Sequence, residues 1–183
     1  TLAEFKLSIS QKYKRHRPRL LILLGNPALL MRDEYRELWG DIPIVLCSEE
    51  NYLGPQETYT KKQAIATADR TPLTQLADPY NMVLLYSNLY LDENIQLICH
   101  IVPEIKKFIF IGDARQINQT NNLDIRNKLK KTHPNVEYQF ITPQDMTTNQ
   151  LLDSLYFVDP KTTGVLFSSW FYNCLLYTSP SPR

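Results

Sequence analysis

The chain has 183 residues, enough for one ordinary domain and a little more. Its 43% hydrophobic residues allow a sizeable core, which excludes a globally disordered chain. The formal net charge of +1 gives no electrostatic basis for a nucleic-acid partner. The three cysteines and three histidines stand far apart and show no metal-ligand spacing, so we expect neither a metal nor another cofactor.

Residues 1–18 predict an amphipathic helix, because four apolar side chains recur at helical spacing. These are Leu2, Phe5, Ile9 and Tyr13. The basic run "KYKRHRPR" at the end of this helix is open to two interpretations. It could contact nucleic acid, or it could be a solvated last turn whose cations complement the helix dipole, and we favour the second. Pro18 then ends the helix.

A strand, a helix and a second strand are predicted next. "RLLILLGN" at residues 19–26 is a short, continuous apolar run, typical of a strand that is buried on both faces. Asn26 is suited to cap the following helix, with Pro27 at its first position, and Gly40 is suited to end it. "IPIVLCSEEN" at residues 42–51 predicts a second buried strand. This alternation is typical of parallel β–α–β units.

Residues 52–80 interrupt the alternation, because they are polar with scattered prolines. They predict an excursion or crossover between two subdomains. "NMVLLYSN" at residues 81–88 is a candidate strand. A helix over residues 91–102 is expected to start at Asp92, and its spacing predicts one apolar face. That face contains Ile95, Ile98 and Val102.

After Pro103 the order strand, helix, strand, helix, strand is predicted. The second of these helices could be capped by Thr147 or Thr148. The five segments cover residues 106–113, 119–134, 136–143, 147–158 and 164–170. We therefore expect an α/β fold with two Rossmann-like lobes and parallel sheets. The expected divisions are a partial first lobe (1–54), a crossover or hinge (55–103), a partial second lobe (104–173) and a non-native tail (174–183).

The tail "CLLYTSPSPR" at residues 174–183 continues no pattern before it. The codons TGT CTC TTA TAC ACA TCT CCG AGC CCA CGA encode it, and that DNA resembles a transposon-end sequencing adapter. We interpret the tail as a library artefact fused in frame, to be left out of the fold. Because the chain also opens inside a helix, we expect the fold to be truncated at both ends. An exposed edge and an uncovered apolar face would then favour aggregation.

Signature motifs of common enzyme classes do not occur in the sequence: GxGxxG, GxxxxGK[ST], GxSxG and HExxH are all missing. His100 falls in the apolar helix predicted above, and we interpret it as a core or boundary residue rather than a general base. Cys47 and Cys99 are interpreted as small buried residues rather than reactive thiols. No catalytic residue is therefore predicted.

The candidate binding residues follow from position, because ligands of open parallel sheets sit beyond the carboxyl ends of the strands. Short polar side chains, acids and an indole at those ends suit a small polar ligand. The candidates are Asn26, Ser48, Glu49, Asn51, Asp113, Arg115 and Trp170. The alternative for each of these residues is a cap or turn residue, and Asn26, Asp113 and Asp145 could all cap helices. Taken together, these ends predict a site in the cleft between the two lobes.

Four stretches resemble a known family: "PRLLILLGNPAL", "IPIVLCSEENYLG", "LYLDENIQLICHIVPEIKKFIFIGD" and "TTNQLLDSLYFVDPKTTGVLFSSWF". They are similar to the extracytoplasmic sensor domain of bacterial hybrid two-component histidine kinases. That domain is itself similar to the periplasmic binding proteins of ABC transporters. The resemblance runs from about Thr1 to Tyr172 and is looser over residues 52–80.

The resemblance implies two lobes like those of class I periplasmic binding proteins, with a ligand cleft and no catalysis in this segment. It also implies a periplasmic location, with a membrane helix and a kinase module of the same chain downstream. Such sensors often work as dimers, so a homodimer is a further expectation. The ligand would shift a population between signalling states.

Three alternatives remain open at this stage. A free binding protein of an ABC transporter has a similar fold and differs in the sequence downstream of the segment. A two-lobed α/β enzyme, such as a nucleotide-sugar transferase, would need a phosphate-binding turn and an acid or base, and Asp113 with Arg115 comes nearest. A receiver-like domain would need clustered carboxylates, which "FIFIGD" alone does not supply.

Overall fold

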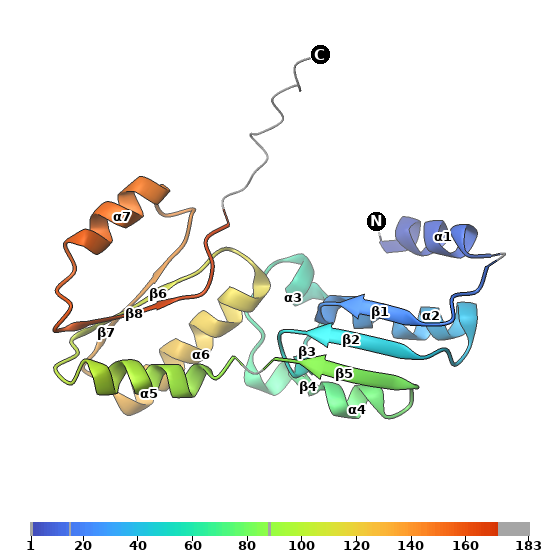
Figure 1. Ribbon diagram of the computed structural model, residues 1–183, viewed down its shortest axis with the longest axis horizontal. Coiled ribbons are helices and arrows are strands. Elements are labelled where there is room, and N and C mark those ends of the chain that lie inside the picture. Colours follow the sequence, from blue (N-terminus) through green and yellow to red (C-terminus); the bar gives the residue numbers. More distant parts are fainter. Residues whose placement is uncertain (1, 15, 88, 172–183) are drawn as a thin grey trace, which may run out of the picture. The chain divides into compact units, whose positions relative to one another are not determined.

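The computed structural model describes residues 2–14, 16–87 and 89–171 and has a mixed α/β fold with parallel sheets (Figure 1). The chain divides into two compact units. The first contains the described residues of 1–60 and 67–89, and the second contains residues 61–66 and the described residues from 90 on. The predicted tail at 174–183 lies outside the described residues, as do the side chains of Leu2 and Phe5 in the predicted apolar stripe.

The first unit contains helices, short 3₁₀ turns and two sheets. Their order is α1 (Leu2–Lys12), β1 (Leu21–Leu24), η1 (Asn26–Met31), α2 (Arg32–Trp39), β2 (Ile44–Ser48), β3 (Tyr52–Leu53), α3 (Gln56–Thr60), η2 (Thr67–Asp69), β4 (Thr71–Pro72), α4 (Leu73–Ala77) and β5 (Met82–Tyr86). The candidate strand at residues 81–88 is therefore confirmed as β5. It pairs with β2, so it belongs to the first unit, although it lies within the crossover or hinge expected at 55–103.

The main sheet of the first unit is parallel, with the strand order β1-β2-β5. Each new strand is added on the same side of the one before it. Since parallel β–α–β connections are right-handed, both connections must pass over the same face of the sheet. The structure agrees, because side chains from η1, α2 and α4 share one core with Leu23 and Leu46 of the strands.

The opposite face of this sheet carries two rows of apolar side chains. In register across the strands, the rows are Ile22–Val45–Val83 and Leu24–Cys47–Leu85. Their outer members Ile22, Leu24, Val83 and Leu85 are each more than half exposed. The prediction that this first strand is buried on both faces is therefore wrong. The expectation of a buried Cys47 is also wrong, because its side chain is only partly buried.

The second unit also has a parallel sheet, but its strand order reverses direction. Its elements are α5 (Leu91–Ile101), β6 (Lys107–Ile111), α6 (Gln116–Thr132), β7 (Glu137–Ile141), α7 (Thr148–Tyr156) and β8 (Thr163–Phe167). The strand order is β7-β6-β8, so the chain steps from β6 to β7 and then back across β6 to β8. The same right-handed rule then places α6 and α7 on opposite faces.

Helices on both faces give the second sheet two cores. On one face Ile95 of α5 and Ile125 of α6 pack with Phe108 and Phe110 of β6. On the other face Leu151 of α7 packs with the intervening strand residues, Ile109 and Ile111 of β6.

The predicted cap of α7 is confirmed at Thr147, whose hydroxyl accepts from the backbone N–H of Gln150 in a capping box. By contrast, His100 of α5 is exposed, so its predicted core or boundary position is wrong. Cys99 is only partly buried, so the expectation that its side chain is buried is also wrong.

A short segment of the second unit comes from inside the first one. Residues 61–66 lie between α3 and η2 in the sequence but belong to the second unit. Ile65 is fully buried there, and its backbone N–H donates to Thr120 Oγ1 of α6 at 3.0 Å. None of the helices within the described ranges is long and apolar enough to cross a membrane.

The uncovered rows of the first sheet should limit solubility rather than stability. We expect the double variant Ile22→Thr, Leu85→Thr to aggregate less and to unfold with a free energy within about 1 kcal/mol of the parent, because both side chains are more than half exposed and the β-branched threonine suits a strand. Light scattering and urea denaturation measure the two quantities. The matched change on the covered face, Leu46→Thr, should destabilise by about 3 kcal/mol. Equal losses of stability in both variants would contradict the open face.

Gly164 of β8 occupies a site that a methyl group cannot enter. A Cβ there would lie 2.3 Å from Ile98 Cγ2 and 2.9 Å from Ile105 Cδ1. Gly164→Ala should therefore lower the free energy of unfolding by about 1–3 kcal/mol, the usual cost of overpacking. In a double-mutant cycle, Ile98→Ala should relieve part of that loss. If the losses of unfolding free energy in the two single variants simply add in the double variant, the new methyl group does not press on Ile98 and this explanation is wrong.

Candidate functional site

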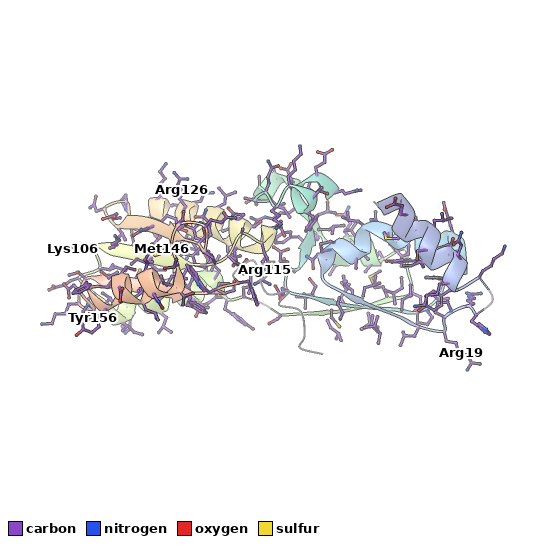
Figure 2. The ribbon with its side chains drawn as sticks, turned by 90° about the horizontal axis from the view of Figure 1, so that it is seen from above. Arg19, Lys106, Arg115, Arg126, Met146 and Tyr156 are labelled. Atoms are coloured by element: carbon purple, nitrogen blue, oxygen red, sulfur yellow. The ribbon has the colours of Figure 1, made fainter. Side chains whose placement is uncertain are left out.

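The candidate site lies in the second unit, at the carboxyl ends of β6 and β8. These two strands are neighbours, and the helices that follow β6 and precede β8 cover opposite faces of the sheet. The loop after β6 and the chain leaving β8 therefore meet at the edge where parallel sheets bind ligands. Arg115, from the first of these loops, lies at the end of the second unit away from Lys106, which marks the amino end of β6 (Figure 2).

Asp113 is the centre of this site and is only 2% exposed. Its Oδ1 accepts from the backbone N–H of Arg115 at 2.9 Å and from Asn118 Nδ2 at 2.9 Å. Its Oδ2 accepts from Ser169 Oγ at 2.7 Å. Arg115 Nε lies 3.0 Å from both carboxylate oxygens. Donors from three parts of the chain therefore converge on one carboxylate.

Asn118, in the first turn of α6, joins the same network from the other side. The side chain is fully buried, and its Nδ2 also lies within hydrogen-bond distance of Ser169 Oγ, at 2.8 Å. Its Oδ1 accepts from Ser168 Oγ at 2.8 Å. Gly112 makes room for this arrangement, because a Cβ there would approach Asn118 Cγ to 3.1 Å. Side-chain hydrogen bonds thus tie the two loops together, in addition to the backbone bond from Ser168 N–H to the Ile111 carbonyl at 2.9 Å.

The network keeps Asp113 ionised. Burial by itself raises the pKa of this carboxyl, but the hydrogen bonds from the Arg115 backbone, Ser169, the Arg115 side chain and Asn118 outweigh it. The net effect is a pKa below the ordinary value. A carboxylate whose acceptor sites are filled in this way is poorly placed to take a proton from a substrate. Its role is to orient Arg115 and Ser169.

Arg115 is the part of the network that faces solvent. Its side chain is 46% exposed, although Nε is held by Asp113. Its guanidinium carbon lies 4.7 Å from the centre of the Phe171 ring, a cation–π distance. The outer edge of the guanidinium, the exposed Ser168 and the exposed Phe171 ring are therefore the groups offered at this edge.

Other predicted residues of the second unit lie beside this network rather than in it. Trp170 donates from Nε1 to Thr148 Oγ1 at 3.0 Å and packs on the core under α7. Asp145 does not cap α7. Instead, its Oδ2 accepts from both the backbone N–H and the hydroxyl of Thr142, each at 2.8 Å, which closes the turn after β7. Of the two alternatives for Asp145, the structure therefore supports the turn residue and not the helix cap.

A second polar cluster lies at the corresponding edge of the first unit. Asn26 is buried and accepts a hydrogen bond from Ser48 Oγ, while its Nδ2 donates to Glu50 Oε2 at 3.3 Å. Tyr52 donates from its hydroxyl to Glu50 Oε1 at 2.5 Å. Asn26 is the first residue of η1, and its side chain makes no cap; Gly25 precedes the turn instead. The N-cap prediction for Asn26 is therefore wrong, because Ser48 and Glu50 use its amide.

The structure brings together Asn26 with Ser48, and Asp113 with Arg115. Glu49 and Asn51 are exposed, and Asn51 contributes a backbone carbonyl to Leu73 N–H. The candidates predicted from the sequence missed the buried cluster members Glu50, Asn118 and Ser169, and also Tyr52 and Ser168 at the rims. A polar residue in the first turn of the helix after "FIFIGD" could have indicated Asn118. Nothing local distinguishes Glu50 from Glu49.

Neither cluster offers an evident metal site: in the part of the chain that the structure describes, no three His, Cys, Asp or Glu residues are grouped to hold an ion. The chain was compared with protein-family models, with curated proteins and with solved structures, and none of them matches it.

The lowered pKa of Asp113 predicts a pH-dependent contribution to stability. A carboxyl with a depressed folded pKa stabilises the fold above its unfolded pKa of about 4, and this stability is lost as the pH falls through the folded value. Asp113→Asn should cost about 2 kcal/mol or more at pH 7, because buried donors lose a charged acceptor. The difference from the parent should shrink below about pH 4.

Urea unfolding of the parent and of Asp113→Asn across this pH range measures the effect. Asp153→Asn, an exposed change on α7, is the matched control and should alter stability by less than about 0.5 kcal/mol. A difference between parent and Asp113→Asn that stays constant down to the acid limb would contradict an ionised Asp113.

Proposed function

We propose that the chain is a ligand-sensing input domain of a bacterial two-component histidine kinase, with two Rossmann-like lobes. In this proposal it binds a small polar ligand and carries out no catalysis. The sensor assignment rests on the sequence resemblance stated above. The binding role is supported by one observation in particular: Arg115 is held at the carboxyl edge of the second sheet by the buried Asp113 and leaves its outer guanidinium edge in solvent.

Such an arrangement suits recognition better than chemistry. The guanidinium is positioned before any ligand arrives, so less side-chain entropy is lost on binding. Its free edge, together with Ser168 and Phe171, matches a small molecule that carries a carboxylate or hydroxyl groups. Among the described residues at this edge, the one buried acid is engaged by four donor groups, which argues against a general base.

Thermal unfolding with three probes tests the binding role. Succinate, L-glutamate and D-ribose at millimolar concentration present a dicarboxylate, an amino acid and a sugar. A probe at about 100 times its Kd adds about 2.7 kcal/mol to the free energy of unfolding by mass action. We expect at least one carboxylate probe to raise the melting temperature, and Arg115→Ala to abolish that rise.

The matched control is Arg126→Ala, which removes an exposed arginine from α6 away from the site (Figure 2). It should keep the full ligand-induced shift. If Arg115→Ala and Arg126→Ala respond alike, Arg115 is not the anchor. If none of the three probes shifts the parent, the proposed ligand class is wrong.

The assignment to a sensor kinase has its own test, which is sequencing of the parent locus on both sides of the segment. The proposal expects an apolar stretch of about 20 residues downstream, followed by kinase motifs. An open reading frame that ends within one further α/β unit, with a signal peptide upstream, would instead indicate a free binding protein.

A further inference from the structure

A pocket of about 370 Å³ lies in the first unit, between the end of α1 and the end of α2. Its walls include Tyr13, Lys14 and Arg17 from one side and Leu38 and Trp39 from the other. The volume is at the lower end of the range of small-molecule sites, about 300–1,000 Å³. It is separate from both polar clusters described above, and none of the candidate residues predicted from the sequence lines it.

The aromatic wall of the pocket is held in place. Trp39 is 7% exposed, and Tyr35 stacks on its ring with a centroid distance of 5.9 Å and an angle of 8°. Tyr13 meets the same indole edge-on, at 6.0 Å and 89°. Lys6 of α1 pairs with Glu34 of α2, which fixes the two helices farther along their length. Tyr13 itself is 37% exposed, so part of its ring is open to a ligand.

The charge of the pocket has one sign. Of the lining residues in the described ranges, Lys14 and Arg17 are charged and none is acidic. Arg17 reaches across to α2, because its Nη2 lies 3.4 Å from the position a Cβ of Gly40 would take. Two cations beside aromatic rings stand out in a chain with a net charge of +1. The basic run that the sequence predicts as a solvated helix end thus contributes side chains to a concave site.

We propose that this pocket binds a small planar aromatic anion. The ring of the ligand packs against Tyr13, Leu38 and Trp39, and its phosphate or carboxylate pairs with Arg17 and Lys14. The volume admits one small molecule rather than a segment of nucleic acid. This inference goes beyond the proposed function, because it concerns another unit and shares no residue with the Arg115 site.

Fluorescence of Trp39 provides a direct readout. The chain has two tryptophans, so Trp170→Phe leaves Trp39 as the single reporter. AMP and benzoate are the anionic probes, and adenosine and benzamide are their neutral counterparts. At least one anion should change the fluorescence saturably, with an affinity about tenfold or more above that of its neutral counterpart, because a charge-assisted pair is lost.

Variants made in the Trp170→Phe background distinguish binding in the pocket from a general effect of positive charge. Arg17→Ala should lower the affinity for the anion about tenfold, and Lys14→Ala should lower this affinity as well. Arg19→Ala removes an exposed cation that does not line the pocket (Figure 2) and should leave affinity within about twofold, as is usual for a distant surface charge. Far-UV circular dichroism checks that each variant is folded.

Several results would overturn the proposal. One is the absence of a saturable change with both AMP and benzoate. Equal affinities for the charged and neutral members of each pair would be another, as would equal losses in Arg17→Ala and Arg19→Ala. If Arg17→Ala lowers the melting temperature but leaves the affinity unchanged, the Arg17 side chain stabilises the helix ends and does not bind the anion.

Discussion

The right-handedness of the β–α–β connection is the constraint on which both units depend. Once the strand order is set, it decides which face of each sheet a connecting helix can cover. In the first unit the strands are added in one direction, so η1, α2 and α4 all cover one face. In the second unit the direction reverses after β7, so helices cover both faces. The open apolar face and the candidate site are two results of the same rule.

The reversal also explains why the second unit can build a site from loops that are far apart in sequence. Asp113 follows β6, while Ser169 follows β8, and the two meet because their strands are neighbours. The ionised carboxylate then serves as a common acceptor that fixes both loops and directs Arg115 outward. In the first unit, Asn26 and Glu50 achieve a similar connection across neighbouring strand ends, with a neutral amide as the link.

The sequence predicted most elements well because their signals are local, but the first helix ends at Lys12 rather than at Pro18. Continuous apolar runs indicated the five-residue strands β2 and β6, and a threonine at position 147 or 148 indicated a capped helix. Exposure was harder to predict, since a run such as "LLILL" is apolar on both faces whether or not a helix covers each one. The prediction that this strand is buried on both faces was therefore right for one face and wrong for the other.

The candidate site was predictable only in part. Strand ends marked Asn26, Ser48, Asp113 and Arg115, because the position of a strand end is a local property. Glu50, Asn118 and Ser169 were missed because their importance depends on which strands become neighbours. The N-cap prediction for Asn26 failed for the same reason, since its partners are 22 and 24 residues away. The long-range pairing of side chains is therefore the information that the local pattern lacks.

The segment at residues 61–66 has a consequence for how this polypeptide can be divided. Because it leaves the first unit, contributes Ile65 beside Thr120, and returns, the chain passes between the units three times. No single cut of the backbone can release two complete units. A fragment ending at residue 89 would carry Ile65 without α6, and a fragment starting at residue 90 would lack the residue that occupies that part of its interior. The second unit therefore depends on a segment inserted within the first for part of its own packing.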